Sequence, residues 1–407
     1  MRAPASKHPA WMEIDLAALA HNAGVLRRAI PADAELGLLV KANAYGHGME
    51  MAARAAVSGG ADQLIVATLD EGLALRGAGL QAPILVVYPI PPDGIGEAVE
   101  ARLELSVSGM NSTRRTLEAW AGLGSQPPDR QLRLHVEVDT GMGRGGVATD
   151  DLVELVRMID AQLATSIVGI WSHLADGRNA GVSAEQVRRF ESAIADLAAT
   201  GRPITRRHLV ATEAIFAETA PAYEMVRVGL GFYGELGLGF HPSPDLAALA
   251  AELRPAMTVK ARPMRLENVP AGTSVGYGRE WVAERRSLIA TLPLGYADGW
   301  ARVYWPGAWA LVRGRRVPLV GRVSMDSVCA DVTDVGEITP DDEFVLLGSQ
   351  GVERITPNEL ARLRRSIPNE VFCSFGPRLP RVYLAHAAVV AVGRAEDRVE
   401  KQDWSGP

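Results

Sequence analysis

The feature that most constrains the fold is an alternation of short apolar runs with longer segments of helical spacing between residues 35 and 234. Several runs are apolar at successive positions, which is typical of parallel strands buried on both faces. Helical segments lie between many of them, such as residues 183–201, with Ser183 and Gly201 as the expected helix ends. Eight strands with intervening helices over ~200 residues predict a (β/α)8 barrel of the TIM type. The runs are residues 35–42, 62–68, 83–89, 103–108, 132–139, 166–173, 206–211 and 225–234.

The later part of the chain consists of short strand-like runs separated by Gly, Pro and Asp turns, which predicts a mostly-β domain. Residues 312–322, VRGRRVPLVGR, indicate a hairpin because Gly314 stands where a tight turn requires it. The expected domains are a barrel over residues 1–244, a C-terminal β domain over residues 245–395 and a flexible tail over residues 396–407.

Composition favours a soluble protein that acts on small molecules. The chain has 42 basic and 48 acidic residues, a net charge of −6 and no long block of like charge, which argues against a nucleic-acid partner. Its two cysteines, Cys329 and Cys373, make neither a disulfide framework nor a structural zinc site, and we expect no metal. No apolar stretch has the length of a signal peptide or a membrane span. We therefore expect a cytoplasmic protein without a membrane partner.

One lysine stands out in the stretch VKANAYGHG, residues 40–48. Lys41 ends the first apolar run, and the carboxyl ends of barrel strands form the catalytic face. A lysine at a strand end is by itself more often a solvated charge. Here small residues, Tyr45 and a Gly-His-Gly turn follow it, and such a crowded site suits an amine that forms a Schiff base.

With four later stretches, this motif resembles the bacterial alanine racemases, which depend on pyridoxal 5′-phosphate. The resemblance extends over nearly the whole chain. Each motif is weak alone, but five in order, within a barrel followed by a β domain, are specific. The four stretches are VDTGMGRGG (residues 138–146), VRVGLGFYG (226–234), VGYGRE (275–280) with LGYADG (294–299), and GRVSMDS (321–327).

The resemblance implies a racemisation with two opposed bases. The lysine that matches Lys41 holds the cofactor as an aldimine and then serves as one base, whereas Tyr277, from the partner subunit of a homodimer, serves as the other. Inversion requires groups on both faces of the α-carbon, because one base would tend to return the proton to its original side. A tyrosine is a poor base at neutral pH unless its surroundings stabilise the phenolate, and His173 matches the residue that supplies this environment.

Further cofactor contacts follow from the same motifs. Arg227 matches the arginine that faces the pyridine nitrogen and donates a hydrogen bond to it without transferring a proton. Backbone N–H groups of Gly229 and Leu230 would bind the phosphate, in agreement with the phosphate sites that follow strands seven and eight of such barrels. The hydroxyl of Tyr45 is a further candidate for this contact.

The resemblance also implies the substrate contacts. Arg144, between glycines in the second motif, corresponds to the arginine that contacts the cofactor and the substrate carboxylate. Met325 and Asp326 match substrate-pocket residues of the partner subunit, and Tyr296 matches a tyrosine at the inner gate of the pocket. The nineteen-residue spacing of Tyr277 and Tyr296 keeps the family's pattern.

Several positions depart from that pattern. At the seventh strand, where the family usually has a phosphate-binding serine, this chain has Thr212 and Glu213. Either Thr212 supplies the hydroxyl, or Glu213 contributes only its backbone N–H, because a carboxylate beside a phosphate is repulsive. Glu137 stands where many members have a carbamylated lysine, and we predict that its carboxylate braces Arg144 from behind.

The leading interpretation is a homodimeric alanine racemase that supplies D-alanine for cell-wall synthesis. A racemase of serine or another small amino acid uses the same site and stays open. A non-catalytic pyridoxal-phosphate carrier on the same barrel is a third alternative, although such carriers lack the β domain that holds Tyr277. A related decarboxylase has no reason to carry the last two motifs.

Overall fold

The computed structural model describes residues 8–125, 127, 130–204, 206–385, 388–393 and 400–401. The chain divides into two compact units. The barrel unit comprises Leu19–Ala44 and Ala52–Arg254, and the β unit comprises Met1–Ala18, Tyr45–Met51 and Pro255–Pro407. Among the described residues, no helix combines the length and the apolar composition that crossing a bilayer requires.

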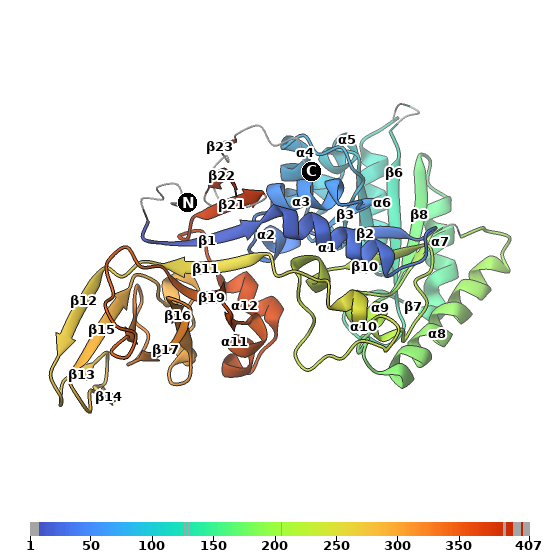
Figure 1. Ribbon diagram of the computed structural model, residues 1–407. Helices are drawn as coiled ribbons and strands as arrows, with labels where there is room; N and C mark the ends of the chain where they lie inside the picture. The colour runs from blue at the N-terminus through green and yellow to red at the C-terminus, as the bar shows by residue number, and fades with distance from the viewer. Residues whose placement is uncertain are drawn as a thin grey trace. The chain divides into compact units, whose positions relative to one another are not determined.

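The barrel unit contains eight parallel strands in a closed ring. The neighbours follow the order β5-β4-β3-β2-β10-β9-β8-β6, and β5 pairs again with β6, which closes the barrel (Figure 1). This arrangement confirms the predicted (β/α)8 barrel, and every predicted apolar run contributes one strand. The strands are β2 (Glu35–Leu39), β3 (Gln63–Val66), β4 (Ile84–Val86), β5 (Leu103–Val107), β6 (Leu132–Asp139), β8 (Thr165–Trp171), β9 (Arg207–His208) and β10 (Met225–Val228), with β7 (Val147–Ala148) paired to β6 outside the ring.

Helices alternate with these strands, and α4, α5 and α7 pack against β4, β5 and β8 respectively. The helix predicted over residues 183–201 forms, but its predicted N-cap is wrong. Helix α8 begins three residues earlier, because the side chain of Asn179 accepts hydrogen bonds from the N–H groups of Gly181 and Val182. The helices are α1 (Leu16–Arg28), α2 (Lys41–Tyr45), α3 (Met49–Ser58), α4 (Leu69–Gly77), α5 (Ile95–Glu100), α6 (Met110–Gly122), α7 (Leu152–Asp160), α8 (Ala180–Ala198), α9 (Thr212–Ala217) and α10 (Ala247–Ala250).

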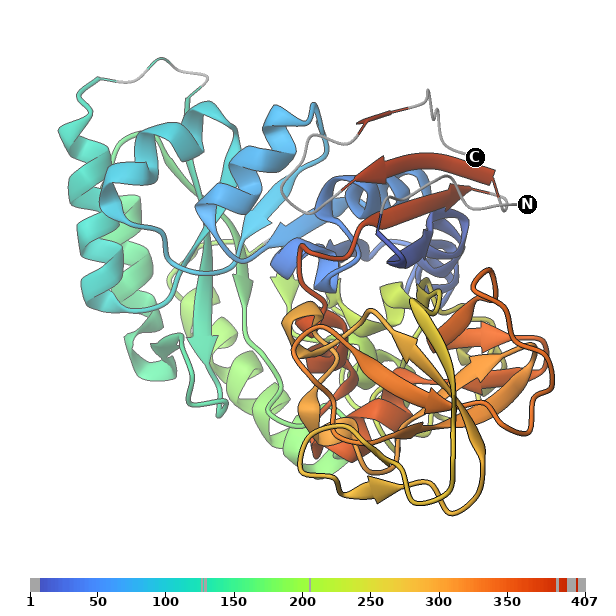
Figure 2. The ribbon, with the colours of Figure 1, turned by 90° about the vertical axis from the view of Figure 1, so that its left-hand side faces the viewer.

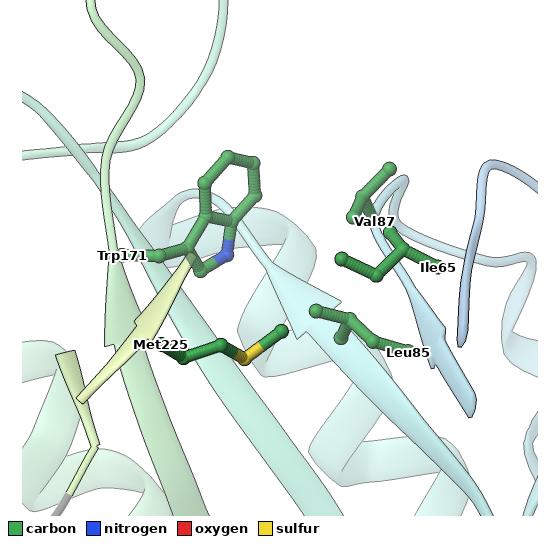
Figure 3. Packing of buried hydrophobic residues seen from close by; sticks show 5 residues of the cluster. All are labelled: Ile65, Leu85, Val87, Trp171 and Met225. Atoms are coloured by element: carbon green, nitrogen blue, oxygen red, sulfur yellow. The ribbon is translucent and has the colours of Figure 1, made fainter. Parts of the chain in front are cut away.

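Part of the barrel interior is a buried apolar cluster, shown in Figure 3, and Leu39 packs against it. Its members are Ile65, Leu85, Val87, Trp171 and Met225. Gly37 of β2 leaves room for this cluster, because a Cβ there would lie 2.5 Å from the Met225 methyl group and 2.8 Å from Ile65 Cδ1. Other buried side chains on the barrel strands are polar, among them those of Glu104, His135, His208 and Arg227, and they are described with the site.

The β unit is built on one large sheet with the order β12-β15-β18-β17-β16-β19-β11-β1-β21-β22-β23, and β20 pairs with β19. This confirms the predicted mostly-β domain. The hairpin of β16 and β17 turns at Arg313 and Gly314, whose φ values of 50° and 72° are those of a tight turn. Figure 2 shows β21 and β22 as a pair of red arrows.

The elements of the β unit are β1 (Ala10–Asp15), β11 (Met257–Ala261), β12 (Arg265–Val269), β13 (Ser274–Val275), β14 (Trp281–Val282), β15 (Ser287–Leu292), β16 (Trp309–Val312), β17 (Arg315–Val320), β18 (Val328–Asp331), β19 (Phe344–Gln350), β20 (Glu353–Ile355), β21 (Arg381–Ala385), β22 (Ala388–Gly393), β23 (Glu400–Lys401), α11 (Pro357–Arg364) and α12 (Pro368–Ser374).

The observed units differ from the expected division at residue 245 in the placement of the first strand. Strand β1 pairs with β11 and β21, so that the N-terminal residues belong to the β unit. Of the expected tail, residues 396–399 and 402–407 lie outside the described residues, while Glu400 and Lys401 form β23.

Candidate active site

Lys41 follows the carboxyl end of β2, where the chain makes a left-handed turn. Ala42, Asn43, Ala44 and Tyr45 all have φ values of 52° or 53°. This conformation costs about 1–2 kcal/mol for each residue that carries a Cβ, and such strain concentrates at functional sites. The chain therefore tolerates strain in this turn, which suggests that the strained backbone is needed to place Lys41.

Contacts around this turn fix the lysine in place. The carboxylate of Glu71 accepts a hydrogen bond of 2.6 Å from the N–H of Ala42 and one of 2.7 Å from the N–H of Ala67. Ahead of the turn, the Tyr233 hydroxyl donates to the Leu39 carbonyl at 2.7 Å. Lys41 is half-buried, and its Nζ lies 5.7 Å from the centre of the Tyr88 ring. The amine is thus presented at the catalytic face by a braced backbone.

Arg227 lies inside the barrel, and its guanidinium is only 4% exposed. It donates from Nη2 to the Ser172 carbonyl at 2.7 Å and to His173 Nδ1 at 3.2 Å, and from Nη1 to His208 Nδ1 at 2.9 Å. Its plane covers the Trp171 ring at 4.7 Å. Burial lowers the pKa of Arg227 to about 9, so that the group still carries its charge at neutral pH.

The hydrogen bond to His208 is the first link of a chain that crosses the barrel interior. His208 Nε2 lies 2.9 Å from His135 Nδ1, and His135 Nε2 lies 2.8 Å from an oxygen of Glu104. Both imidazoles are fully buried. Burial lowers the pKa of His208 and that of His135, so both rings are neutral. We call Arg227, His208, His135 and Glu104 the interior relay.

The proton positions in the interior relay follow from its two ends. A guanidinium can only donate, so His208 Nδ1 accepts, and the single proton of this neutral ring is on Nε2. That proton is donated to His135 Nδ1, which leaves the proton of His135 on Nε2, facing Glu104. A carboxylate can only accept, so both ends require the same tautomers. Every donor in the interior relay therefore points from Arg227 towards Glu104.

Glu104 is almost fully buried, and burial alone would raise its pKa. Hydrogen bonds from His135 and Arg133, together with the charge of Arg133, outweigh this effect and hold the pKa of Glu104 below its ordinary value. Arg133 donates from Nε at 3.1 Å and from Nη2 at 2.5 Å, and Gln63 Nε2 donates at 2.6 Å. The carboxylate is thus the fixed negative end of the interior relay.

The loop after β6 carries Arg144, which is exposed. Asp139 organises this loop, because its Oδ1 accepts hydrogen bonds of 2.9, 2.9 and 3.1 Å from the N–H groups of Gly141, Met142 and Gly143. The loop folds back over β6 so closely that a Cβ on Gly145 would lie 3.1 Å from Glu137 Oε2. The sequence had not suggested this role of Asp139, although an aspartate ahead of a glycine-rich turn is a recognisable signal.

Glu137 is buried beside two arginines. Burial raises the pKa of this carboxyl group, while the charges of Arg144 and Arg227 act in the opposite direction. The bracing of Arg144 by Glu137 stays a prediction, and the effect of Arg227 on this carboxyl group had not been predicted.

Cations predominate around His173. Burial lowers the pKa of His173 to about 3, and the charges of Arg227, Arg144 and Lys41 add to this effect. Three cationic side chains therefore act on one neutral histidine, with Glu137 as their buried anionic neighbour. Such a site fits a ligand that carries several negative charges, which is true of a pyridine phosphate together with an amino-acid carboxylate.

Three of the predicted phosphate contacts, Thr212, Gly229 and Leu230, also lie in the barrel unit. Thr212 is buried, and its Oγ1 accepts a hydrogen bond of 3.3 Å from the N–H of Gly231. Gly229 and Leu230 immediately precede this glycine, whose Cβ would lie 2.9 Å from the Thr212 methyl group. The Thr212 hydroxyl and the turn at Gly231 thus fit closely together, and we call them the cradle. At position 231, any side chain larger than that of glycine would fill the space between them.

The β unit holds the other group of predicted residues. Tyr277 forms a β-bridge with Arg322, and the segment that follows carries Met325 and Asp326. Tyr296 joins this group because its N–H donates to the Ser324 carbonyl at 3.1 Å. A cavity of about 340 Å³ lies beside Tyr277. The side chains of Tyr277, Tyr296 and Met325 are 65%, 42% and 53% exposed, which is unusual for large apolar groups so close together.

Tyr45 also belongs to the β unit, where its ring is buried. Burial raises the pKa of Tyr45, the Cys373 thiol adds to this effect, and a hydrogen bond with the Asn369 side chain opposes it. Its hydroxyl therefore lies at α12, which contains both of these residues.

Two models of known protein families match most of the chain. Residues 14–237 match the alanine racemase N-terminal domain and residues 256–383 match the alanine racemase C-terminal domain. Alanine racemase 2 of Caldanaerobacter subterraneus subsp. tengcongensis is 36% identical over 387 residues, which are 94% of this chain and 97% of the relative. The alanine racemase of Symbiobacterium thermophilum is 37% identical over 383 residues, with 92% and 97% of the chains covered.

Solved structures agree with these matches. An alanine racemase from Streptomyces lavendulae, a producer of D-cycloserine, has a TM-score of 0.83 and 34% identity, covering 93% of this chain and 97% of its own. An alanine racemase of Bacillus anthracis with bound L-Ala-P has a TM-score of 0.86 and 30% identity, covering 95% and 98%. Both the fold and the sequence are thus shared over nearly the full length.

Proposed function

Since the chain belongs to the alanine racemase family, we propose that it interconverts L-alanine and D-alanine in the cytoplasm with pyridoxal 5′-phosphate, and supplies D-alanine for cell-wall synthesis. The observation that carries this proposal is the combination of Lys41 on its strained turn with the cations that surround His173. When bound, the cofactor withdraws electrons from the α-carbon of the amino acid and so acidifies its proton. The fixed positions of the protein groups decide the rest.

In the barrel unit, the amine of Lys41 would hold the cofactor covalently until the substrate amine replaces it, and the released amine would exchange a proton with one face of the α-carbon. Arg227 donates a hydrogen bond to the pyridine nitrogen but keeps its own proton, since the interior relay holds it as a donor. Thr212 and the N–H groups of Gly229 and Leu230 bind the phosphate. Arg144 binds the substrate carboxylate and orients the α-proton towards Lys41.

Tyr277 of a second copy supplies the base on the opposite face, and Tyr296, Met325 and Asp326 of that copy line the substrate pocket. The unusual exposure of three of these side chains supports their burial in a homodimer. His173 is neutral and its Nδ1 accepts from Arg227, so its proton is on Nε2 and the ring is suited to give a hydrogen bond to the oxygen of the incoming tyrosine. The hydroxyl of Tyr45 is proposed as a further phosphate ligand.

A deuterium experiment tests this function directly. Purified protein is incubated with L-alanine or L-serine in deuterated water, and α-deuteration and chirality are followed over time. We expect inversion of alanine with deuterium at the α-carbon, and loss of both inversion and the visible absorbance of the bound cofactor in Lys41→Ala. Inversion of serine alone would favour the alternative substrate, and an unchanged absorbance in Lys41→Ala would contradict the role of the lysine.

Mixing two inactive variants tests whether the site is shared. Tyr277→Phe is expected to lose inversion but to retain exchange of the α-hydrogen of D-alanine through Lys41. After subunit exchange between Lys41→Ala and Tyr277→Phe, half of the dimers are mixed and each of these has one intact site, so that about one quarter of the activity returns. No recovery, with mixed dimers present by mass, would show that both residues act within one chain.

Glu137→Gln tests the bracing of Arg144. We expect a higher KM for alanine with a smaller change in kcat, because the amide no longer attracts the guanidinium that binds the substrate carboxylate. Glu154→Gln, an exposed position in α7, is the matched control. An unchanged KM would contradict the role of Glu137.

A further inference from the structure

An acidic residue follows Thr212 directly, at the place where the proposed phosphate site requires positive or neutral surroundings. Glu213 is the second residue of α9, and Thr212 contacts the turn that follows β10. An unpaired carboxylate so close to a phosphate would oppose binding, because like charges repel strongly where water is partly excluded. If the chain binds pyridoxal 5′-phosphate as proposed, it must avoid that repulsion.

The side chain of Glu213 is held by Arg178, which belongs to the loop after β8. Arg178 Nε donates to Oε2 at 2.8 Å and Nη2 donates to Oε1 at 2.5 Å, so that the two groups meet as a planar fork. Arg178 Nη1 also donates to the Leu238 carbonyl at 2.8 Å. The hydrogen bond with Glu213 raises the pKa of Arg178.

Gly237 shows that this geometry is built in. A Cβ on Gly237 would overlap both Arg178 Nη2 and Glu213 Oε1. Its φ is not in the left-handed region, so the backbone there would accept alanine and only the space for the ion pair requires glycine. The fork therefore depends on three segments, which lie after β8, after β9 and after β10.

A contribution to folding stability does not explain the Arg178–Glu213 ion pair well. The side chains of Arg178 and Glu213 are 37% and 30% exposed, and ion pairs with this exposure contribute little to folding. What the fork does change is the charge beside Thr212. It neutralises the carboxylate and directs its oxygens towards Arg178 and Gly237.

We propose that Arg178 is a positioning residue for the cofactor phosphate, which acts by neutralising Glu213 and by holding its side chain away from the cradle of Thr212 and Gly231. Thr212 then supplies the hydroxyl at this strand, and Glu213 faces the phosphate only with its backbone. A different explanation is that Arg178 binds the phosphate itself, and then Glu213 would merely orient it.

The two explanations differ in a double-mutant cycle that measures cofactor binding. Apoprotein is titrated with pyridoxal 5′-phosphate, and the visible absorbance of the lysine-bound form gives Kd. We expect Arg178→Ala to weaken binding about tenfold or more, because it leaves Glu213 charged and unpaired. Arg178→Ala combined with Glu213→Ala should return Kd to within about threefold of the wild type. If the double variant binds as weakly as Arg178→Ala, Arg178 contacts the phosphate itself and the proposal is overturned.

Two further measurements distinguish an effect on phosphate binding from a general loss of cofactor binding. Pyridoxal, which lacks the phosphate, should bind wild type and Arg178→Ala with equal Kd, and a loss for both ligands would overturn the proposal. Gly237→Ala displaces the fork while all charges remain, and it should also weaken binding of the phosphate form only. A wild-type Kd for pyridoxal 5′-phosphate in Arg178→Ala contradicts the role of Arg178 alone, whereas failure of the wild type to bind the cofactor at Lys41 contradicts the proposed function.

Discussion

Replacing Glu104 by glutamine tests the interior relay at its far end. The substitution keeps the size of the side chain but turns one acceptor oxygen into an N–H donor. If the carbonyl oxygen of the glutamine side chain faces His135, its NH2 group faces Arg133, and two donors then meet. If the amide faces His135 instead, that ring must accept, its other nitrogen must donate to His208, and His208 in turn presents an N–H to Arg227.

The first orientation costs less free energy, so it determines how much stability the substitution removes. Hydrogen bonds to charged groups contribute about 1.5–3 kcal/mol, and removing one partner of a buried ion pair costs about 3–5 kcal/mol. Arg133 is 46% exposed and can turn into water, so the upper value is not reached. The second orientation adds a clash of two buried donors at Arg227. We therefore expect Glu104→Gln to lower the free energy of unfolding by about 2–3 kcal/mol.

Urea unfolding of the apoprotein, followed by circular dichroism, measures this loss, with Glu100→Gln as a control. Glu100 is also a glutamate paired with an arginine, but it is exposed, so its substitution should cost less than about 1 kcal/mol. Selective ¹⁵N labelling of histidine reports the tautomers of His135 and His208, both expected to be protonated at Nε2. A wild-type His208 protonated at Nδ1, or equal effects of the two glutamine substitutions, would refute the assignment of the interior relay.

Three other predictions concern the barrel unit. Gly169→Ala should cost about 1–3 kcal/mol of stability in the same urea assay, because its Cβ would overlap His135 Nδ1 and lie 3.2 Å from His208 Nε2; an unchanged midpoint would contradict this packing. Since the folded-state pKa values of His135, His208 and His173 lie below the ordinary value, the stability they contribute is fully present above pH 6.5 and is lost as pH decreases below it. For His173, with a folded-state pKa of about 3, the loss approaches about 1.4 kcal/mol per pH unit well below pH 6.5. Thermal unfolding between pH 7.5 and 5 measures this slope, and a flat profile would refute it. Asp139→Ala should raise KM for alanine about tenfold, because the N–H groups of the loop that carries Arg144 lose their acceptor. Asp139→Asn keeps one acceptor oxygen and should retain most of the affinity. Equal KM values for the two variants would contradict the role of the carboxylate oxygen.

Much of the fold could be predicted because its signals are local. A strand buried on both faces must be apolar at successive positions, and several of the eight runs meet this requirement independently of the others. The position of Lys41 follows from the same logic, since the end of a run identifies the end of a strand. Even β9 was located, although only Arg207 and His208 of the predicted residues 206–211 pair as a strand.

Other features depend on partners distant in sequence. The membership of β1 in the β unit follows from its pairing with β11 and β21, which its own residues do not encode. The start of α8 was mistaken for a simpler reason: Ser183 is a good cap, but Asn179 is as good and lies where the loop already turns. In such cases local preference allows two answers, and tertiary structure selects one.

The interior relay was not predicted from the sequence, because its four residues lie on four different strands. Glu104 is on β5, His135 on β6, His208 on β9 and Arg227 on β10. Read singly, each is a polar residue interrupting an apolar run. One signal was available, because the alternation in LRLHVEVD places His135 and Glu137 on the same face of β6. Recognising a shared inward face on each strand would have brought the two histidines together.

The two parts of the barrel interior place different demands on the sequence. In the cluster of Figure 3, dispersion and burial stabilise the core, so that a substitution such as Met225→Leu keeps most of the energy if volume is conserved. In the interior relay, an apolar residue of equal volume would leave a buried donor or acceptor unpaired on each side of the gap. A charged Arg227 so deeply buried requires acceptors, and His208, His173 and the Ser172 carbonyl accept its hydrogen bonds, while the chain of two histidines ends on the carboxylate of Glu104. The interior relay therefore supports Arg227 in the proposed active site, although most of it lies too deep to touch a substrate.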